Sequence, residues 1–196
     1  MEGSVNGSQR GNGSQRERVP EPGAGPTTDL LRDSRSLRGI FSSFATGVTV
    51  VTVGGDSPHA MTANSFTSVS LDPPLILVCV ECDAAMHGSL LEVGSFGVSV
   101  LAADQQHVAL LYANRWRPRD PTQFDRPGWA RGARTGAPLA RGALAWFECA
   151  LWRAYDAGDH SIFVGRLLTA ERHDRRDALV YHSGQFRGLP DRAPVE

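Results

Sequence analysis

Residues 47–53 read GVTVVTV, and this stretch decides the fold class. β-Branched side chains lose freedom in a helix and fit the pleated surface of a sheet, so a run dominated by Val and Thr favours a strand. The run ends at Gly54-Gly55-Asp56, a sequence typical of a tight turn. We therefore expect a β-strand over residues 47–53.

After residue 53, further strand-like runs follow, joined by short polar or Gly/Pro connections. They cover residues 59–70, 75–80, 96–101, 143–151, 161–168 and 178–182. Helical spacing of apolar residues is confined to 84–93, 104–113 and an amphipathic helix over Asp29–Phe44, for which Thr28 or Asp29 is the expected N-cap. Many short strands with few helices predict an antiparallel barrel. No G-x-G-x-x-G follows a strand, which argues against a doubly wound dinucleotide-binding fold.

The ends of the chain differ in composition from its middle. Residues 1–27 are rich in Gly, Ser, Asn, Gln, Arg and Pro, which predicts a disordered tail. We expect one domain over 28–190 and a flexible C-terminus over 191–196. Residues 114–137 are expected to form a long surface loop. Its arginines at 115, 117 and 119 could meet a nucleotide phosphate, although a solvated loop explains them as well.

Composition excludes several function classes. The chain has 196 residues, 41% of them hydrophobic, and a formal net charge of −1, so the charge footprint of a protein that binds nucleic acid or an anionic membrane is missing. All 20 basic residues are arginine. Schiff-base chemistry, a lysine general base and a P-loop lysine are therefore excluded.

The cysteines indicate a reducing compartment. There are three, Cys79, Cys82 and Cys149, and the sequence shows neither a signal peptide nor an apolar run long enough to span a bilayer. We therefore expect a cytoplasmic protein. The C-x-x-C spacing of Cys79 and Cys82 has no second pair or histidine cluster at zinc-site spacing, so no metal site is expected.

Residues 61–70, MTANSFTSVS, are the densest candidate for a binding surface. In one continuous strand, alternate residues would place four hydrogen-bonding groups and one aromatic ring on a single face. A half-exposed strand with a solvated Ser/Thr face explains the pattern equally well. The candidate gains weight beside residues 46–49, because Gly47 lets a flat ligand approach the backbone.

Together these segments make the sequence recognisable. Residues 37–189 resemble the short-chain flavin reductases of two-component flavin monooxygenases. The matching stretches are 44–52, 61–74, 96–105, 142–149 and Gly158-Asp159-His160. The resemblance implies a mainly β, FMN-binding split β-barrel of Greek-key type, with about six antiparallel strands and a few flanking α-helices. It also implies a homodimer that reduces FMN or FAD with NADH or NADPH and delivers reduced flavin to a partner monooxygenase.

The resemblance further implies which residues contact the cofactors. His160 is the expected catalytic residue, positioning the nicotinamide over the flavin. The expected cofactor contacts are Thr46, Gly47, Val48, Thr49, Thr62, Ala63, Asn64, Ser65, Phe66, Ser68, Val69, Ser70, His87, Ser89, Gly158, Asp159 and His182. Hydride transfer between cofactors needs geometry rather than a side-chain acid or base, which agrees with the lack of a triad or paired carboxylates.

Two other functions remain open at this point. The same barrel could hold FMN permanently, as in oxidases resembling the pyridoxamine-phosphate type. It could also be a non-catalytic flavin-binding module in which His160 has only a structural role, because a lone histidine at a turn is ordinary.

Overall fold

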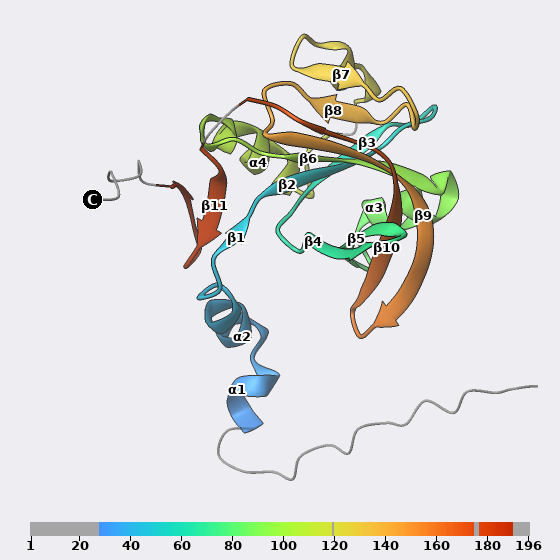
Figure 1. Cartoon of the computed structure of the whole chain (residues 1–196). Helices are drawn as coiled ribbons and strands as arrows, with labels where there is room; N and C mark the ends of the chain where they lie inside the picture. Colours follow the sequence, from blue (N-terminus) through green and yellow to red (C-terminus); the bar gives the residue numbers. More distant parts are fainter. Residues whose placement is uncertain (1–27, 119, 175–176, 190–196) are drawn as a thin grey trace, which may run out of the picture. The chain divides into compact units, whose positions relative to one another are not determined.

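A computed structural model describes residues 28–118, 120–174 and 177–189 (Figure 1). The expected N-terminal tail, 1–27, and the expected flexible C-terminus, 191–196, lie outside these ranges. Contacts divide the chain into two units, 1–37 and 38–196. Within the described ranges, every helix is too short or too polar to cross a bilayer.

The first unit contains helix α1 (Thr28–Arg32) and the start of α2 (Ser34–Phe41). The prediction of one helix over Asp29–Phe44 is wrong, because the helix is interrupted at Asp33. The Asp33 carboxylate accepts hydrogen bonds from the backbone N–H groups of Arg35 (3.0 Å) and Ser36 (3.2 Å). It thus caps a new helix. The side chains of the expected caps, Thr28 and Asp29, are outside the described part of the structure.

The second unit is built on one antiparallel sheet with the strand order β3-β2-β6-β9-β10-β5-β4 (Figure 1). Its strands are β2 (Thr49–Val53), β3 (His59–Ala63), β4 (Thr67–Leu71), β5 (Pro74–Glu81), β6 (Ser95–Val100), β9 (Ala145–Ala157) and β10 (His160–Arg172). The mainly β prediction is confirmed. The sheet has seven strands rather than about six.

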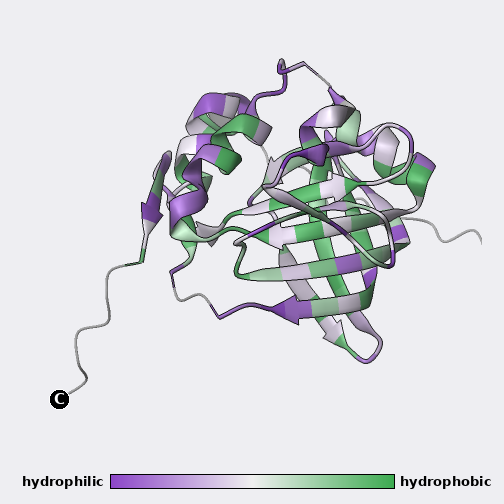
Figure 2. Cartoon of the chain, turned by 90° about the horizontal axis from the view of Figure 1, so that it is seen from above, coloured by the Kyte–Doolittle hydropathy of each residue, from purple (hydrophilic) through white to green (hydrophobic). Residues whose placement is uncertain are grey.

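The strand expected over residues 47–53 is interrupted at Val48, because Gly47 ends β1 (Thr46–Gly47) in another sheet and β2 begins at Thr49. Burial of strand β2 explains why residues 49–53 show no alternation. Its residues are all buried, since Val51 and Val53 face one core cluster and Val50 faces another. Helix α3 (Ala85–Val93) covers the first cluster with Met86 and Leu90. Helix α4 (Gln106–Ala113) covers the second with Ala109 and Tyr112. Figure 2 shows apolar residues gathered along the strands of the sheet.

The expected single strand over 59–70 is wrong, and the consequence reaches the candidate site. β3 ends at Ala63 and β4 begins at Thr67, with a further register irregularity between Ser68 and Ser70. The expected common face of Thr62, Asn64, Phe66, Ser68 and Ser70 therefore does not exist. Phe66 instead stacks on Phe147, with ring centroids 5.6 Å apart, and packs against the core.

Smaller elements complete the unit. They are β1 (Thr46–Gly47), β11 (Leu179–His182) and β12 (Gln185–Gly188) in one sheet, β7 (Trp129–Arg131) and β8 (Pro138–Ala140) in a hairpin, and the 3-10 helices Ala103–Gln105 and Pro121–Asp125. The loop predicted over 114–137 thus contains a 3-10 turn and a strand. Glu148, 3% exposed, fixes this hairpin by accepting hydrogen bonds from the backbone N–H groups of Arg134 and Thr135.

Candidate active site

A cavity of about 620 Å³ opens between β3, the end of β5 and the segment that follows α4. This volume is typical of a small-molecule site. Its lining residues are His59, Ala60, Met61, Thr62, Ala63, Asn64, Ser65, Cys79, Glu81, Asp83, Ala84, Ala85, Met86, Tyr112, Ala113, Arg115, Trp116, Arg117 and His160. The cavity thus unites the expected residues Thr62, Ala63, Asn64 and Ser65 with His160.

The pairing of β5 with β10 places His160 in this cavity. In the antiparallel register Glu81 lies opposite His160, and opposed residues project to the same face. Along β5, Cys79 and Glu81 line the cavity while Val78 and Val80 are buried in the core. The same alternation sends Ser161 to the buried side of β10.

A tight turn at the start of β10 orients His160. Gly158 has a φ of 74°, a left-handed conformation that glycine adopts without strain. The next residue, Asp159, lies 2.6 Å from Nδ1 of His160 through its Oδ1. The hydrogen bond from His160, reinforced by the charge of that ring, lowers the pKa of the Asp159 carboxyl. An ionised carboxylate only accepts hydrogen bonds, so Nδ1 carries the proton and Nε2 is left for other contacts.

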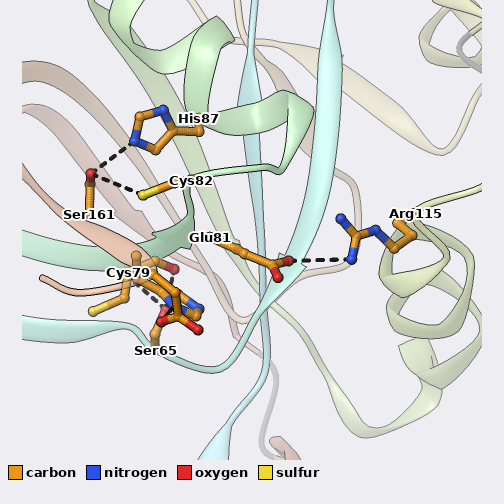
Figure 3. Close-up of polar contacts among 9 residues, drawn as sticks. Ser65, Cys79, Glu81, Cys82, His87, Arg115 and Ser161 are labelled. Carbon is orange, nitrogen blue, oxygen red and sulfur yellow. Dashed lines mark hydrogen bonds and ion pairs between the residues drawn. The ribbon is translucent and has the colours of Figure 1, made fainter.

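Two expected hydroxyl contacts are used to hold the cavity wall. Thr62 Oγ1 donates to the carbonyl oxygen of Ala109 on α4, at 2.7 Å. Ser65 Oγ lies 3.0 Å from both the backbone nitrogen and the backbone oxygen of Cys79 (Figure 3). The break between β3 and β4 leaves the side chain of Asn64 exposed at the cavity. Asn64 and the neighbouring backbone are therefore the polar groups that this wall offers to a ligand.

The structure adds residues to those expected at the cofactor site. Arg115 forms an ion pair with Glu81, with 3.5 Å between Nη1 and Oε2 (Figure 3). Cys79 and Glu81 could have been found from alternation along strand 75–80, because every second residue of a strand shares a face. Arg115 and Arg117 were noted in the sequence, but nothing there placed their loop beside residues 61–65.

His87 and Ser89 lie outside this cavity. His87 Nε2 lies 2.8 Å from Ser161 Oγ (Figure 3). The His87 ring also meets the Phe163 ring edge-on, with 5.2 Å between the ring centroids. Ser89 Oγ donates to the carbonyl oxygen of Ala85 within α3. Both side chains therefore have structural partners on the far side of β10 or within their own helix.

The remaining expected contacts fall in three other places. Val48 and Thr49 are buried, and Thr49 Oγ1 donates to the carbonyl oxygen of Ala63 at 2.8 Å. Thr46 and Gly47 pair with β11, which also carries His182. Ser68, Val69 and Ser70 lie on β4, an edge strand of the large sheet. None of these residues lines the cavity.

One of these residues has an unused polar group. Thr46 Oγ1 is buried and, among the described residues, has no hydrogen-bond partner. A buried hydroxyl without a partner costs free energy, so this group is a candidate for a contact that the single chain does not supply. The described ranges contain no group of three or more His, Cys, Asp or Glu side chains arranged to hold a metal ion.

A second cavity, of about 480 Å³, lies where α4 faces the β7–β8 hairpin. Val108, Leu111 and Trp129 contribute its apolar wall, and Tyr112 borders both cavities. No residue expected at the cofactor site lines it. The larger cavity is therefore the candidate active site.

Comparison with known proteins finds flavin reductases among the similar sequences and structures. The sequence profile of the flavin reductase like domain matches residues 41–190. An NADH-dependent FAD reductase of Streptomyces globisporus is 49% identical over 164 residues, covering 83% of this chain and 90% of the relative. The solved structure of an NADH:FAD oxidoreductase from Streptomyces globisporus C-1027 superposes with a TM-score of 0.77 at 46% identity, covering 88% of this chain and 99% of that one.

A third similar protein is named for the oxygenase that it serves. The styrene monooxygenase flavin reductase of Pseudomonas putida S12 has a TM-score of 0.69 at 31% identity, covering 80% of this chain and 98% of that one.

Proposed function

The chain belongs to the flavin reductase like family, and from this premise we propose that it oxidises NADH and reduces FMN or FAD, which leaves as reduced flavin for a partner monooxygenase. The observation that carries the proposal is the meeting of His160 with residues 62–65 in one cavity. These segments are far apart in the sequence, and both carry the resemblance to flavin reductases.

The cavity fits a flavin in size and in chemistry. Its volume of about 620 Å³ is within the range of small-molecule sites, and it combines an apolar wall, including Met61 and Met86, with a few polar groups. When bound, the flavin and the nicotinamide supply the hydride chemistry themselves. The chain's own contribution is to bind and orient them, with Asn64 and the backbone of residues 62–65 as flavin contacts.

His160 is proposed as the residue that positions the nicotinamide. Asp159 holds Nδ1, which fixes the ring's tautomer and orientation and leaves Nε2 available. Orientation is worth much in a reaction between two bound rings, because a misplacement of about 1 Å can cost 10²-fold in rate. Gly158 and Asp159 contribute by shaping the turn that presents His160.

The proposal includes a homodimer and a cofactor role for expected contacts outside the cavity: Thr46, Gly47, Val48, Thr49, Phe66, Ser68, Val69, Ser70 and His182. His87 and Ser89 are left out of it, because both side chains have structural partners. Phe44 is 77% exposed, Phe41 68% and Leu71 94%, an amount of exposed apolar surface that favours association. A second subunit that covers such surface could also supply a partner for Thr46 Oγ1. Light scattering on the purified full chain measures this association.

A cytoplasmic location is part of the same proposal. All three cysteines are free thiols. Free thiols persist in a reducing compartment, where NADH is also the ordinary reductant.

The experiment that tests the function is steady-state oxidation of NADH and of NADPH, followed by absorbance, with FMN, with FAD and without added flavin. We expect turnover with NADH that depends on added flavin. Turnover without added flavin would indicate an oxidase with permanently bound FMN. Flavin binding without oxidation of either nicotinamide would overturn the enzyme proposal and leave a flavin-binding module.

A further inference from the structure

Trp116 is a large aromatic side chain placed at the cavity and left open to solvent. It is 86% exposed, and it lines the cavity together with its neighbours Arg115 and Arg117. A single exposed aromatic residue is ordinary on a protein surface. An exposed indole at the cavity proposed for the cofactors is different, because its flat apolar face is available to a second flat group.

Contacts of Arg117 and Asn114 hold this segment in place. Arg117 donates through Nη2 to the carbonyl oxygen of Ala60 on β3, and its guanidinium lies 4.6 Å from the centroid of the Tyr112 ring. Asn114 Oδ1 accepts a hydrogen bond from the backbone N–H of Trp116, at 3.0 Å. Trp116 is thus tied to β3 and α4 through its neighbour Arg117, while its ring stays exposed.

Arg115 lies beside the indole. Its guanidinium carbon is 5.7 Å from the centroid of the Trp116 ring, and Nη1 forms the ion pair with Glu81. A guanidinium has five N–H donors, so the ion pair leaves donors for a phosphate oxygen. In a chain without lysine, arginine is the side chain left for this task. Because Glu81 and Asp83 also line the cavity, the local charge is nearly balanced and phosphate attraction is modest.

We propose that Trp116 stacks on the adenine of a bound dinucleotide, with Arg115 beside its diphosphate. The inference rests on the proposed function, because the same cavity takes the redox rings. Both FAD and NADH carry an adenosine diphosphate end, whereas FMN and reduced nicotinamide mononucleotide lack the adenine. Trp116 therefore determines preference for a dinucleotide over the corresponding mononucleotide.

The test is a binding titration on the full chain, following the fluorescence of FAD, FMN, NADH and reduced nicotinamide mononucleotide in turn. The variants are Trp116→Ala and Trp116→Phe. Trp152→Ala is the matched control, because Trp152 is also exposed, at 44%, and also has an arginine near its ring, Arg166 at 5.8 Å, yet it does not line the cavity. Melting temperatures confirm that each variant is folded.

Stacking of a base on an aromatic side chain contributes enough that its removal should raise the Kd of the dinucleotide by about five- to tenfold. We expect this rise in Trp116→Ala for FAD, for NADH or for both, a smaller rise in Trp116→Phe, and less than about twofold for either mononucleotide or in the control. A rise for FAD alone assigns the subsite to the flavin, and a rise for NADH alone assigns it to the nicotinamide cofactor.

Equal effects on each dinucleotide and its mononucleotide, or no effect on any, would overturn the inference. Failure of the proposed function is seen separately, since it is a lack of NADH oxidation by the wild-type chain with FMN. The Kd ratios are measured by binding alone and do not depend on turnover.

Discussion

His160 is the first residue of strand β10, and His87 contacts the next residue, Ser161, but the two imidazoles lie on opposite sides of the sheet. His87 contacts Ser161 and Phe163, whose side chains face the core, and its Nε2 is used in the 2.8 Å contact with Ser161 Oγ. His160 projects to the other face, into the cavity, with only Nδ1 held by Asp159. One imidazole is fixed by packing and the other keeps a nitrogen available. Strand alternation, rather than residue type, separates these two roles.

The most direct test of this difference is a substitution of His160. We expect His160→Ala to lower kcat/KM for NADH by roughly 10- to 100-fold with FMN as acceptor, because the nicotinamide loses a positioning contact. The Kd of FMN alone, from fluorescence quenching, should change by less than about twofold, since loss of a positioning contact affects orientation more than binding. A variant with wild-type kcat/KM would remove His160 from the proposed site.

Two thiols near β10, Cys79 and Cys82, provide a second test of the difference between its two sides. Cys79 lines the cavity, whereas Cys82 lies near Ser161, with 4.0 Å between Sγ and Oγ. Burial raises the pKa of Cys79, so its alkylation by N-ethylmaleimide should already be slower than that of the exposed Cys82. Saturating FMN should slow Cys79 by about tenfold more, because a ligand in the cavity covers it, and should leave Cys82 unchanged.

Mass spectrometry of the alkylated peptides measures these rates. Cys149 serves as an internal reference, because burial and the negative charge of Glu148 raise its pKa to about 12 and keep it unreactive in the native state. Equal protection of Cys79 and Cys82 would contradict binding of the flavin in this cavity only, because Cys82 does not line it.

The His87 side is tested at its partner. Ser161→Ala removes the hydroxyl that meets Nε2 of His87 and leaves that nitrogen, half-buried, without this contact. We expect a loss of about 1 kcal/mol in the free energy of unfolding, measured with urea, since this is typical of one hydrogen bond. The Kd of FMN should stay within about twofold, as expected for a mainly structural contact. A large change in Kd would instead connect His87 to the flavin, as the family resemblance implies.

Most of the fold could be predicted from the sequence, because the strands are buried on one or both faces and their residues show it. Of the run over 47–53, residues 49–53 form β2 as expected, whereas Gly47 belongs to β1 and Val48 lies between the two strands. The break at residues 64–66 was not predicted, although Asn64 and Ser65 are residue types that favour turns over strands. After the break, Phe66 stacks on Phe147, a long-range contact that has no local signal. Asp33 likewise ends one helix by capping the next, a local competition that a periodic pattern hides.

Only part of the candidate site follows from the sequence, because the rest depends on contacts between distant segments. His160 and residues 62–65 line one cavity, and they were expected there because the contiguous segments that carry them resemble flavin reductases. The cavity wall formed by Arg115, Trp116 and Arg117 comes from a loop whose composition suits solvent equally well, and its position depends on contacts with Ala60 and Tyr112. Such long-range contacts leave no local signal. The partnership of His87 with Ser161 is hidden for the same reason.

The smallest expected effect concerns the carboxylate that holds His160. The hydrogen bond from His160, and then the charge of its ring, lower the pKa of Asp159 below its ordinary value of 3.8. Removing the ring in His160→Ala should therefore move the midpoint of Asp159 back up toward that value, as followed by NMR of the carboxyl carbon. Because the native pKa is depressed, the associated stability is present above about pH 4 and is lost as the pH falls through the lowered native value. The exposed position of the pair makes this contribution small. An unchanged midpoint would mean that Asp159 does not hold the ring in solution, so that His160 enters the cavity without a fixed tautomer. In that case the loss of kcat/KM on replacing His160 with alanine should be smaller than the loss expected above.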